Sequence, residues 1–295
     1  MLERCPSPIA GALPSADDRA HPRGFSAGSL ITDVPCPVAG WDPGEQNIGE
    51  TNVGSDGLPQ AFYQRCQDVL SRFLGGSAGV ALGTISNEQG RLFPGEERLV
   101  SGAARKRISE FTAGRTLARH AMSRLGLDAA PLLADGNGCP EWPRGITGSI
   151  SHSGSACLAA VCSTEVVESL GVDIETSFPQ NNVYPYICTP NELLQISCID
   201  QPAERVQLIF SAKESFFKCY YQTYGRFIGF EAAEVTGIEE GGSAGSFAVH
   251  LVSSGGAGEK PQRFPGVWIR HHRTIVTAVL QEHGGVDAKP APDWR

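Results

Sequence analysis

The stretch that decides the fold and the chemistry is Ser169-Leu170-Gly171-Val172-Asp173-Ile174-Glu175. Its alternating apolar residues predict a β-strand, in which side chains two residues apart point to the same face. Asp173 and Glu175 would therefore lie side by side. Two adjacent carboxylates repel each other unless a hard cation such as Mg²⁺ coordinates them. The alternative is a surface strand with two solvated acids, and the spacing alone leaves both interpretations open.

Composition limits the class of protein. The 295 residues include 41% hydrophobic and 19% charged residues, which is typical of a globular chain. The net charge of -8 argues against a protein that binds nucleic acid through charge, although it permits a local phosphate site. Nine cysteines without a Cys-x-x-Cys pair fit neither a disulfide framework nor a zinc ribbon, so we expect a cytoplasmic protein with reduced thiols. No apolar run approaches the roughly 20 residues that span a membrane, so we expect no membrane association.

The chain divides into four predicted parts. Residues 1–58 are acidic and rich in proline and glycine, which predicts a poorly ordered leader because little apolar surface offsets the chain entropy. Residues 59–165 and 166–283 repeat the order strand, helices, strands, which predicts an α+β fold with two halves. Residues 284–295 form a predicted tail. In the second half, the pattern predicts a helix over 203–221 and strands over 227–235, 246–252, 267–270 and 274–280.

A basic segment runs from Arg98 to Arg124, with seven Lys or Arg residues and one acid. Its apolar residues recur at helical spacing, so Arg115 and Arg119 would share a face of the helix. Arg107 lies eight residues before Arg115, about 80° round an ideal helix, and could converge on the same ligand. In an acidic chain, a phosphate would explain this local positive charge. The alternative is a solvated basic face.

A run of polar residues lies before the strand of Asp173 and Glu175. Its sequence is Ser149-Ile150-Ser151-His152-Ser153-Gly154. A serine hydrolase is disfavoured because the run lacks the G-x-S-x-G pattern and because a histidine next to a serine cannot fold back as its base. We interpret the run as a turn whose backbone and side-chain donors, including Ser151 and His152, face an anion such as a phosphate.

The predicted helix over 203–221 supplies a third acid. Glu214 would complete a Mg²⁺ site with Asp173 and Glu175, leaving room for phosphates on the metal, and Lys218 would face the same phosphates. The alternative is a salt bridge between Glu214 and Lys218, four residues apart, worth about 0.2–0.5 kcal/mol.

Four motifs follow one another along the chain. They are Phe111-Thr112-Ala113-Gly114-Arg115 with Ala118-Arg119, Trp142-Pro143 with Gly148-Ser149-Ile150-Ser151-His152-Ser153, Gly171-Val172-Asp173-Ile174-Glu175, and Phe210-Ser211-Ala212-Lys213-Glu214-Ser215-Phe216-Phe217-Lys218. In this order and spacing they resemble the 4'-phosphopantetheinyl transferase superfamily, and within it the enterobactin synthetase component D type. The likeness covers roughly residues 80–280, and Leu92-Phe93-Pro94 adds to it.

The resemblance implies an activity and an architecture. The activity is transfer of 4'-phosphopantetheine from coenzyme A to a serine of an apo acyl, peptidyl or aryl carrier protein, with release of 3',5'-ADP. The architecture is two similar α/β halves related by pseudo-twofold symmetry, with coenzyme A and Mg²⁺ in the cleft between them. The implied partners are coenzyme A and carrier protein domains, and we expect a monomer.

The resemblance also implies roles for single residues. Asp173, Glu175 and Glu214 match metal ligands, and Lys218 matches the lysine on the pyrophosphate. Glu192 matches an acid near the acceptor serine. The matches at the nucleotide end are Arg107, Arg115 and His152, the last near the 3'-phosphate. Glu214, Glu192 or a water on the metal would take the proton of the acceptor serine, and Glu214 is favoured because it reaches both metal and phosphate.

One departure and two alternatives remain. Relatives often carry a lysine in the loop before Trp142-Pro143, where this chain has Ala134-Asp135-Gly136-Asn137, so one contact to the nucleotide is missing or supplied by Arg144. A noncatalytic relative that binds coenzyme A or a carrier is one alternative. A magnesium-dependent phosphohydrolase or nuclease is the other, although the order Lys213-Glu214 differs from the Glu-x-Lys of such enzymes.

Overall fold

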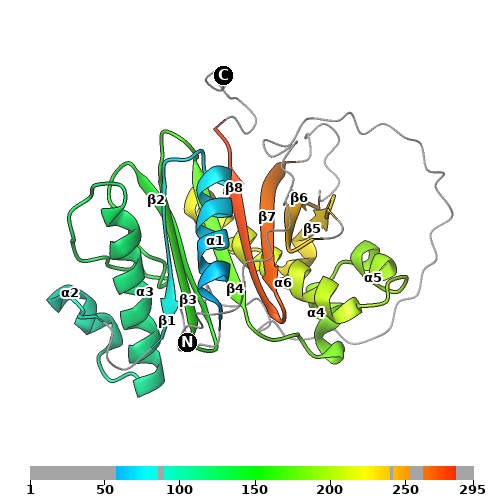
Figure 1. The fold of residues 1–295 in the computed structure, drawn as a ribbon, viewed down its shortest axis with the longest axis horizontal. Coiled ribbons are helices and arrows are strands. Elements are labelled where there is room, and N and C mark those ends of the chain that lie inside the picture. Colours follow the sequence, from blue (N-terminus) through cyan, green and yellow to red (C-terminus); the bar gives the residue numbers. More distant parts are fainter. Residues whose placement is uncertain (1–57, 86–89, 240–241, 253–261, 284–295) are drawn as a thin grey trace.

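The computed structural model describes residues 58–85, 90–239, 242–252 and 262–283. The predicted tail and all of the predicted leader except Leu58 lie outside these residues. Within them the chain forms helices and two antiparallel sheets (Figure 1), which confirms the predicted α+β fold. No described helix combines the length and the apolar character needed to cross a membrane.

The first half is built on a three-stranded sheet with the order β1-β3-β2. Both pairings are antiparallel. Helix α3 covers one face of this sheet, because its buried residues share a core cluster with Ala81, Ile150 and Val161. The elements are α1 (Gln60–Phe73), β1 (Ala78–Thr84), α2 (Pro94–Glu97), the 3-10 helix η1 (Arg98–Val100), α3 (Arg105–Ser123), β2 (Ile146–Ser153) and β3 (Ala156–Ser163).

The second half is built on a five-stranded sheet with the order β4-β8-β7-β6-β5. Helix α6 covers the face that carries Ile275 and Val279. The elements are β4 (Ser169–Glu175), η2 (Asn181–Val183), α4 (Tyr184–Ile187), α5 (Pro190–Ile196), α6 (Pro202–Tyr224), η3 (Phe230–Ala232), β5 (Ala233–Thr236), β6 (Ala244–Leu251), β7 (Arg263–His271) and β8 (Thr274–Gln281).

Three sequence predictions differ from these bounds. The strand expected over 227–235 begins only at Ala233, after a 3-10 turn. The strand expected over 267–270 is longer and begins at Arg263. The polar run from Ser149 to Ser153 was interpreted as a turn and is instead part of strand β2, because its serines alternate with other residues and its backbone pairs with β3.

The two halves repeat one arrangement. In each, a first strand pairs with the last strand, and that last strand pairs with the strand before it: β1-β3-β2 in one half and β4-β8-β7 in the other. A glycine sits where a helix crosses the first strand. A Cβ on Gly79 would lie 1.9 Å from the Ala121 carbonyl oxygen of α3, and a Cβ on Gly171 would lie 1.9 Å from the Ser215 carbonyl oxygen of α6. This repetition confirms the prediction of two similar halves.

Helix α1 joins the two sheets into one core. Its buried residues Phe62, Cys66 and Leu70 share a cluster with Leu158 of the first sheet and with Val172 of the second. Figure 1 shows α1 between the two sheets. The helix is amphipathic, and its apolar side packs against both halves.

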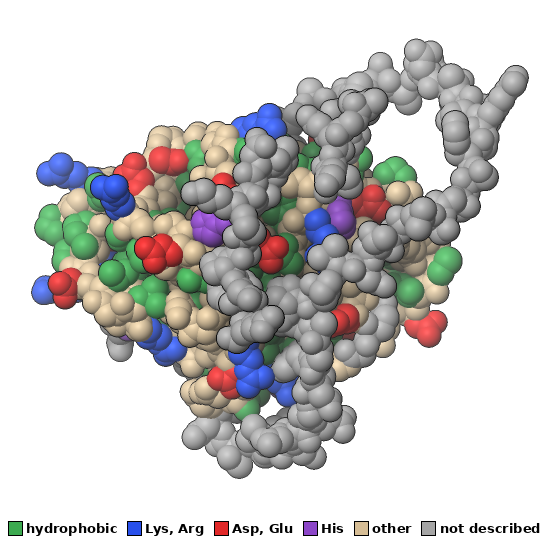
Figure 2. All heavy atoms as spheres, turned by 90° about the horizontal axis from the view of Figure 1, so that it is seen from above, with side chains coloured by type: hydrophobic (Ala, Val, Ile, Leu, Met, Phe, Trp, Pro, Cys, Tyr) green, Lys and Arg blue, Asp and Glu red, His purple; other side chains and the backbone are tan. Residues whose placement is uncertain are grey.

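Charged residues of both signs are mixed on the face shown in Figure 2. The described part of that face has no broad area of a single sign. That face therefore shows no broad basic patch to attract a polyanion.

Candidate active site

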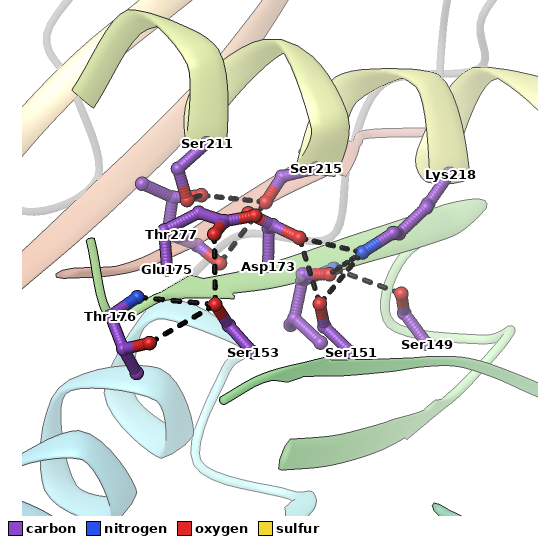
Figure 3. A network of polar contacts seen from close by, with 11 residues as sticks. Ser149, Ser151, Ser153, Asp173, Glu175, Thr176, Ser211, Ser215, Lys218 and Thr277 are labelled. Atoms are coloured by element: carbon purple, nitrogen blue, oxygen red, sulfur yellow. Dashed lines mark hydrogen bonds and ion pairs between the residues drawn. The ribbon is translucent and has the colours of Figure 1, made fainter. Parts of the chain in front are cut away.

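Three serines of β2 face the acidic strand of the other half. The Ser149 hydroxyl accepts a hydrogen bond from the Val172 amide (3.0 Å). Ser151 donates to Oδ1 of Asp173 (2.8 Å), and Ser153 donates to Oε2 of Glu175 (2.9 Å). Figure 3 shows these side chains directed across the junction of β2 and β4. The alternation of β2 thus places one polar row on the boundary between the halves.

Lys218 of α6 completes a buried polar centre with Asp173. Its ammonium nitrogen lies 2.8 Å from Oδ1 of Asp173, 3.0 Å from the Ser151 hydroxyl and 3.0 Å from the Val172 carbonyl oxygen. Only 3% of Asp173 is exposed. The close approach of α6 at Gly171 brings the lysine to the strand. A buried pair of this kind persists because each charge neutralises the other and because hydrogen bonds satisfy the remaining donors.

One carboxylate oxygen of Asp173 is placed to bind a hard cation. Oδ1 of Asp173 takes both the serine and the lysine, whereas Oδ2 is buried and makes no hydrogen bond. Thr277, the β8 neighbour of Asp173, bonds to Ser211 and Ser215 of α6, so α6 covers the face of the sheet that carries the acids. A buried carboxylate oxygen without a donor fits a metal ligand.

Glu214, the third predicted metal ligand, lies on the same helix as Lys218 but is not part of the Asp173–Lys218 pair. Glu214 is buried on α6, one turn before Lys218. Among the residues that the structure describes, no group of three His, Cys, Asp or Glu side chains is arranged to hold a metal ion. The structure therefore brings Asp173 and Lys218 together with a serine, and it places Glu175 on the same face of β4, without assembling a three-carboxylate cluster.

The two predicted nucleotide-binding arginines, Arg107 and Arg115, both lie beside the Phe111 ring of α3. The guanidinium of Arg115 lies 4.2 Å from the centre of the Phe111 ring, and that of Arg107 lies 5.5 Å from it. Arg115 is fully buried, and its Nε donates to the Leu132 carbonyl (2.8 Å). Arg119 has a different role, because it forms an ion pair with the buried Glu96 (2.7 Å).

His152 lies on the side of β2 that faces the arginine helix. It alternates with Ser151 and Ser153, and it shares the strand face of Ile150, which packs in the core beneath α3. Ser151 and His152 therefore serve opposite faces of one strand. The serine joins the acidic centre, and the histidine lies on the face of β2 that α3 covers.

Both carboxylate oxygens of Glu192 form contacts within the second half. Oε2 accepts from the Thr189 amide in a capping box at the start of α5, and it pairs with Nζ of Lys213 (2.7 Å). Oε1 accepts from the Val235 amide (2.7 Å). Burial lowers the pKa of Lys213, and the carboxylate of Glu192 raises it in part. These contacts tie α5, α6 and β5 together.

A pocket opens beside the polar centre, between the loop that precedes β2 and helix α6. Lys218, Tyr221, Trp142 and Ser149 line it together with residues 137–140. Sequence reasoning singled out Lys218 and overlooked Tyr221, although Tyr221 follows the lysine by three residues and so shares its side of the helix.

Sequence comparisons match both halves to one family. The model of the 4'-phosphopantetheinyl transferase N-terminal domain matches residues 95–162, and that of the 4'-phosphopantetheinyl transferase superfamily matches residues 169–255. The 4'-phosphopantetheinyl transferase Svp of Streptomyces mobaraensis is 35% identical over 194 residues, which cover 64% of this chain and 78% of that protein. The chain belongs to the 4'-phosphopantetheinyl transferase superfamily.

Two other relatives agree with this assignment. The 4'-phosphopantetheinyl transferase PptT of Mycobacterium tuberculosis is 30% identical over 203 residues, covering 63% of this chain and 85% of that protein. Enterobactin synthase component D of Salmonella typhi is 34% identical over 191 residues, covering 63% and 76%. The resemblance stated from the motifs is thereby confirmed, including the enterobactin synthetase component D type. This phosphopantetheinyl transferase carries its polar centre at the junction of the two matched parts.

Proposed function

We propose that the chain transfers 4'-phosphopantetheine from coenzyme A to a serine of an apo carrier protein and releases 3',5'-ADP. Membership of the superfamily assigns it to the transferases. The observation that carries the finer proposal is the buried centre of Asp173, Lys218 and Ser151 at the junction of the halves. Proteins that move phosphorylated groups act mainly by positioning the reactants and neutralising charge, and this centre offers both.

We propose that Asp173 and Glu175, with Glu214 from α6, would hold Mg²⁺. The unpartnered Oδ2 of Asp173 supports this assignment, because a cation can use it without breaking the bond between Oδ1 and Lys218. When bound, the metal would neutralise negative charge on the pyrophosphate of coenzyme A. A chelator should therefore abolish transfer.

The protein's own residues divide the remaining work in this proposal. Arg107, Arg115 and His152 bind the nucleotide end of coenzyme A, and Ser151 orients Asp173 and Lys218. Lys218 stabilises charge on the departing 3',5'-ADP. Glu214 takes the proton of the acceptor serine in preference to Glu192, because both oxygens of Glu192 are committed to structural contacts.

The domain boundary predicted near residue 165 also remains a proposal. The two family matches end and begin at residues 162 and 169, which supports it. We further propose that the chain acts as a monomer in the cytoplasm. The seven described cysteines form no disulfides, which supports a reducing compartment.

A mass measurement tests the proposed function. The full chain is incubated with coenzyme A, Mg²⁺ and an apo carrier protein, and the carrier is weighed. A gain of one phosphopantetheine group, lost when coenzyme A is omitted, is the expected result. Tight binding of coenzyme A without any gain would contradict the transferase and favour the noncatalytic alternative.

Replacement of Arg107 by methionine tests the nucleotide end. We expect Arg107→Met to raise the KM for coenzyme A by about tenfold and to change kcat little, because the lost contact is made equally in the ground and transition states. Arg105→Met is the matched control, since Arg105 is exposed two residues earlier on the same helix. A lower kcat with an unchanged KM would assign Arg107 to the reacting centre instead.

A further inference from the structure

The loop before β2 is organised by one aspartate. Oδ1 of Asp135 accepts from the amides of Asn137 and Cys139 (2.9 Å each). Ala134 and Pro140 form a β-bridge that closes the loop at its base. Asp135 thus shapes residues 135–139, which we name the pocket loop, and its second oxygen remains available for a contact outside the loop.

That contact comes from the other half of the protein. The Tyr221 hydroxyl of α6 donates to Oδ2 of Asp135 (2.7 Å), and Nδ2 of Asn137 donates to the Tyr221 oxygen (2.7 Å). The Tyr221 ring is stacked on Phe227, with ring centres 4.6 Å apart and planes 20° apart. The tyrosine is therefore held by its ring and presents its hydroxyl to two groups of the loop.

The electrostatics of this contact are consistent with a persistent link. Desolvation raises the pKa of Asp135, but the hydrogen bonds from Tyr221 and from the loop amides outweigh it and hold that pKa below its usual value of 3.8. The bond to Asp135 and desolvation raise the pKa of Tyr221 above 10.0. The carboxylate stays charged as pH falls to the unfolded pKa of Asp, and the phenol stays protonated as pH rises to the unfolded pKa of Tyr.

The link lies at the wall of the pocket beside the buried polar centre. Tyr221 and Lys218 lie one helical turn apart and line the same pocket, and Asn137 and Cys139 of the pocket loop also line it. The loop carries no lysine or arginine of its own between Asp135 and Cys139. Its position relative to Lys218 is therefore set by neutral and anionic hydrogen bonds across the two halves.

We propose that Tyr221 is a positioning residue that fastens the pocket loop to α6 and so fixes the spacing between that loop and Lys218. This inference rests on the proposed function, in which Lys218 contacts coenzyme A. If the link holds the loop in the binding geometry, its loss weakens coenzyme A binding more than it slows the chemical step, because the loop itself holds no reacting group.

The test removes one oxygen atom, in Tyr221→Phe. The variant keeps the stack on Phe227 and loses both loop contacts. We expect the KM for coenzyme A to rise by about tenfold and kcat to change by less than about twofold. In the absence of coenzyme A, we expect faster alkylation of Cys139 by iodoacetamide, measured by peptide mass spectrometry, with the exposed Cys198 as internal reference.

Tyr220→Phe is the matched control. Tyr220 precedes Tyr221 on the same helix, and its hydroxyl accepts hydrogen bonds from Arg226. The control therefore tests the loss of a hydroxyl that does not reach the pocket loop. A double variant, Asp135→Ala with Tyr221→Phe, should raise KM no further than Asp135→Ala alone, because both changes break the same link.

Each result is decisive. Unchanged Cys139 alkylation in Tyr221→Phe overturns the link, whatever the activity. Faster alkylation with an unchanged KM overturns the positioning role. A similar rise of KM in Tyr220→Phe would show a general loss of helix packing and would also overturn it. If the wild-type protein transfers no phosphopantetheine, the proposed function fails, and the alkylation comparison still tests the link by itself.

Discussion

Asp173→Asn is expected to lower the rate of phosphopantetheine transfer by about a thousandfold. The neutral amide binds a cation less well than the carboxylate does, and it leaves Lys218 without a charged partner. The substitution keeps the shape of the side chain. The measurement is the initial rate of carrier modification at saturating coenzyme A and Mg²⁺. Asp128→Asn makes the same chemical change at an exposed position and should leave the rate unaltered. Near-wild-type transfer by Asp173→Asn would show that the metal assignment is wrong.

The same variant is expected to lose stability, which has to be separated from loss of chemistry. It leaves Lys218 buried without its carboxylate, and breaking a buried ion pair in this way costs about 3–5 kcal/mol. The double variant Asp173→Asn with Lys218→Met removes both charges. We expect it to regain stability in urea unfolding and to remain inactive. Recovery of activity together with stability would mean that the pair serves folding alone.

The second large effect is expected at Glu192. Glu192→Ala removes the partner of Lys213, which is 0% exposed, and also removes the capping box of α5. We expect the free energy of unfolding to fall by about 3–5 kcal/mol, since an uncompensated buried ammonium remains. Urea unfolding measures this loss. Glu165→Ala, at an exposed glutamate, is the matched control and should change stability little.

The pH dependence of this loss gives a further check. Desolvation lowers the pKa of Lys213, and the carboxylate of Glu192 is the main influence that opposes it, so the pKa falls further when that carboxylate is removed. The folded state then releases its proton before the unfolded state does, so stability rises with pH up to the unfolded lysine value of 10.5. The deficit of Glu192→Ala should therefore shrink as the pH is raised toward 10.5. A constant deficit would contradict a charged Lys213 as its cause.

The kcat of a second variant, Glu192→Gln, separates two roles for Glu192. If it only braces the second half, the folded fraction of Glu192→Gln keeps a normal kcat. If it takes the proton of the acceptor serine, Glu192→Gln loses kcat even where the protein is fully folded. The capping box, the ion pair and the bond to Val235 favour the first outcome.

Local pattern predicted the elements that carry the site. The alternation around Asp173 and Glu175 predicted β4, and the apolar spacing in the basic segment predicted α3. Such features depend on neighbours along the chain, so spacing alone reveals them.

The features that were overlooked depend on contacts between distant residues. Lys218 was expected to pair with Glu214 or to face a phosphate, and it pairs with Asp173, 45 positions away. The loop residue Asp135 meets Tyr221, 86 positions away. No periodicity predicts which buried donors will meet, because the crossing of α6 over β4 at Gly171 decides it.

The residues that follow the two crossing glycines, Gly79 and Gly171, differ between the halves. Counting outward from Gly79, the first strand has Ala81 and Gly83 where the strand of Gly171 has Asp173 and Glu175. Ala81 packs in the apolar core beneath α3, whereas its counterpart holds the ammonium of Lys218 beneath α6. One scaffold is thus used twice: one copy has an apolar core beneath its helix, and the other has a buried polar centre. The half whose first strand has no acids still contributes to the polar centre, because Ser151 and Ser153 of its strand β2 donate hydrogen bonds to Asp173 and Glu175 of the other half.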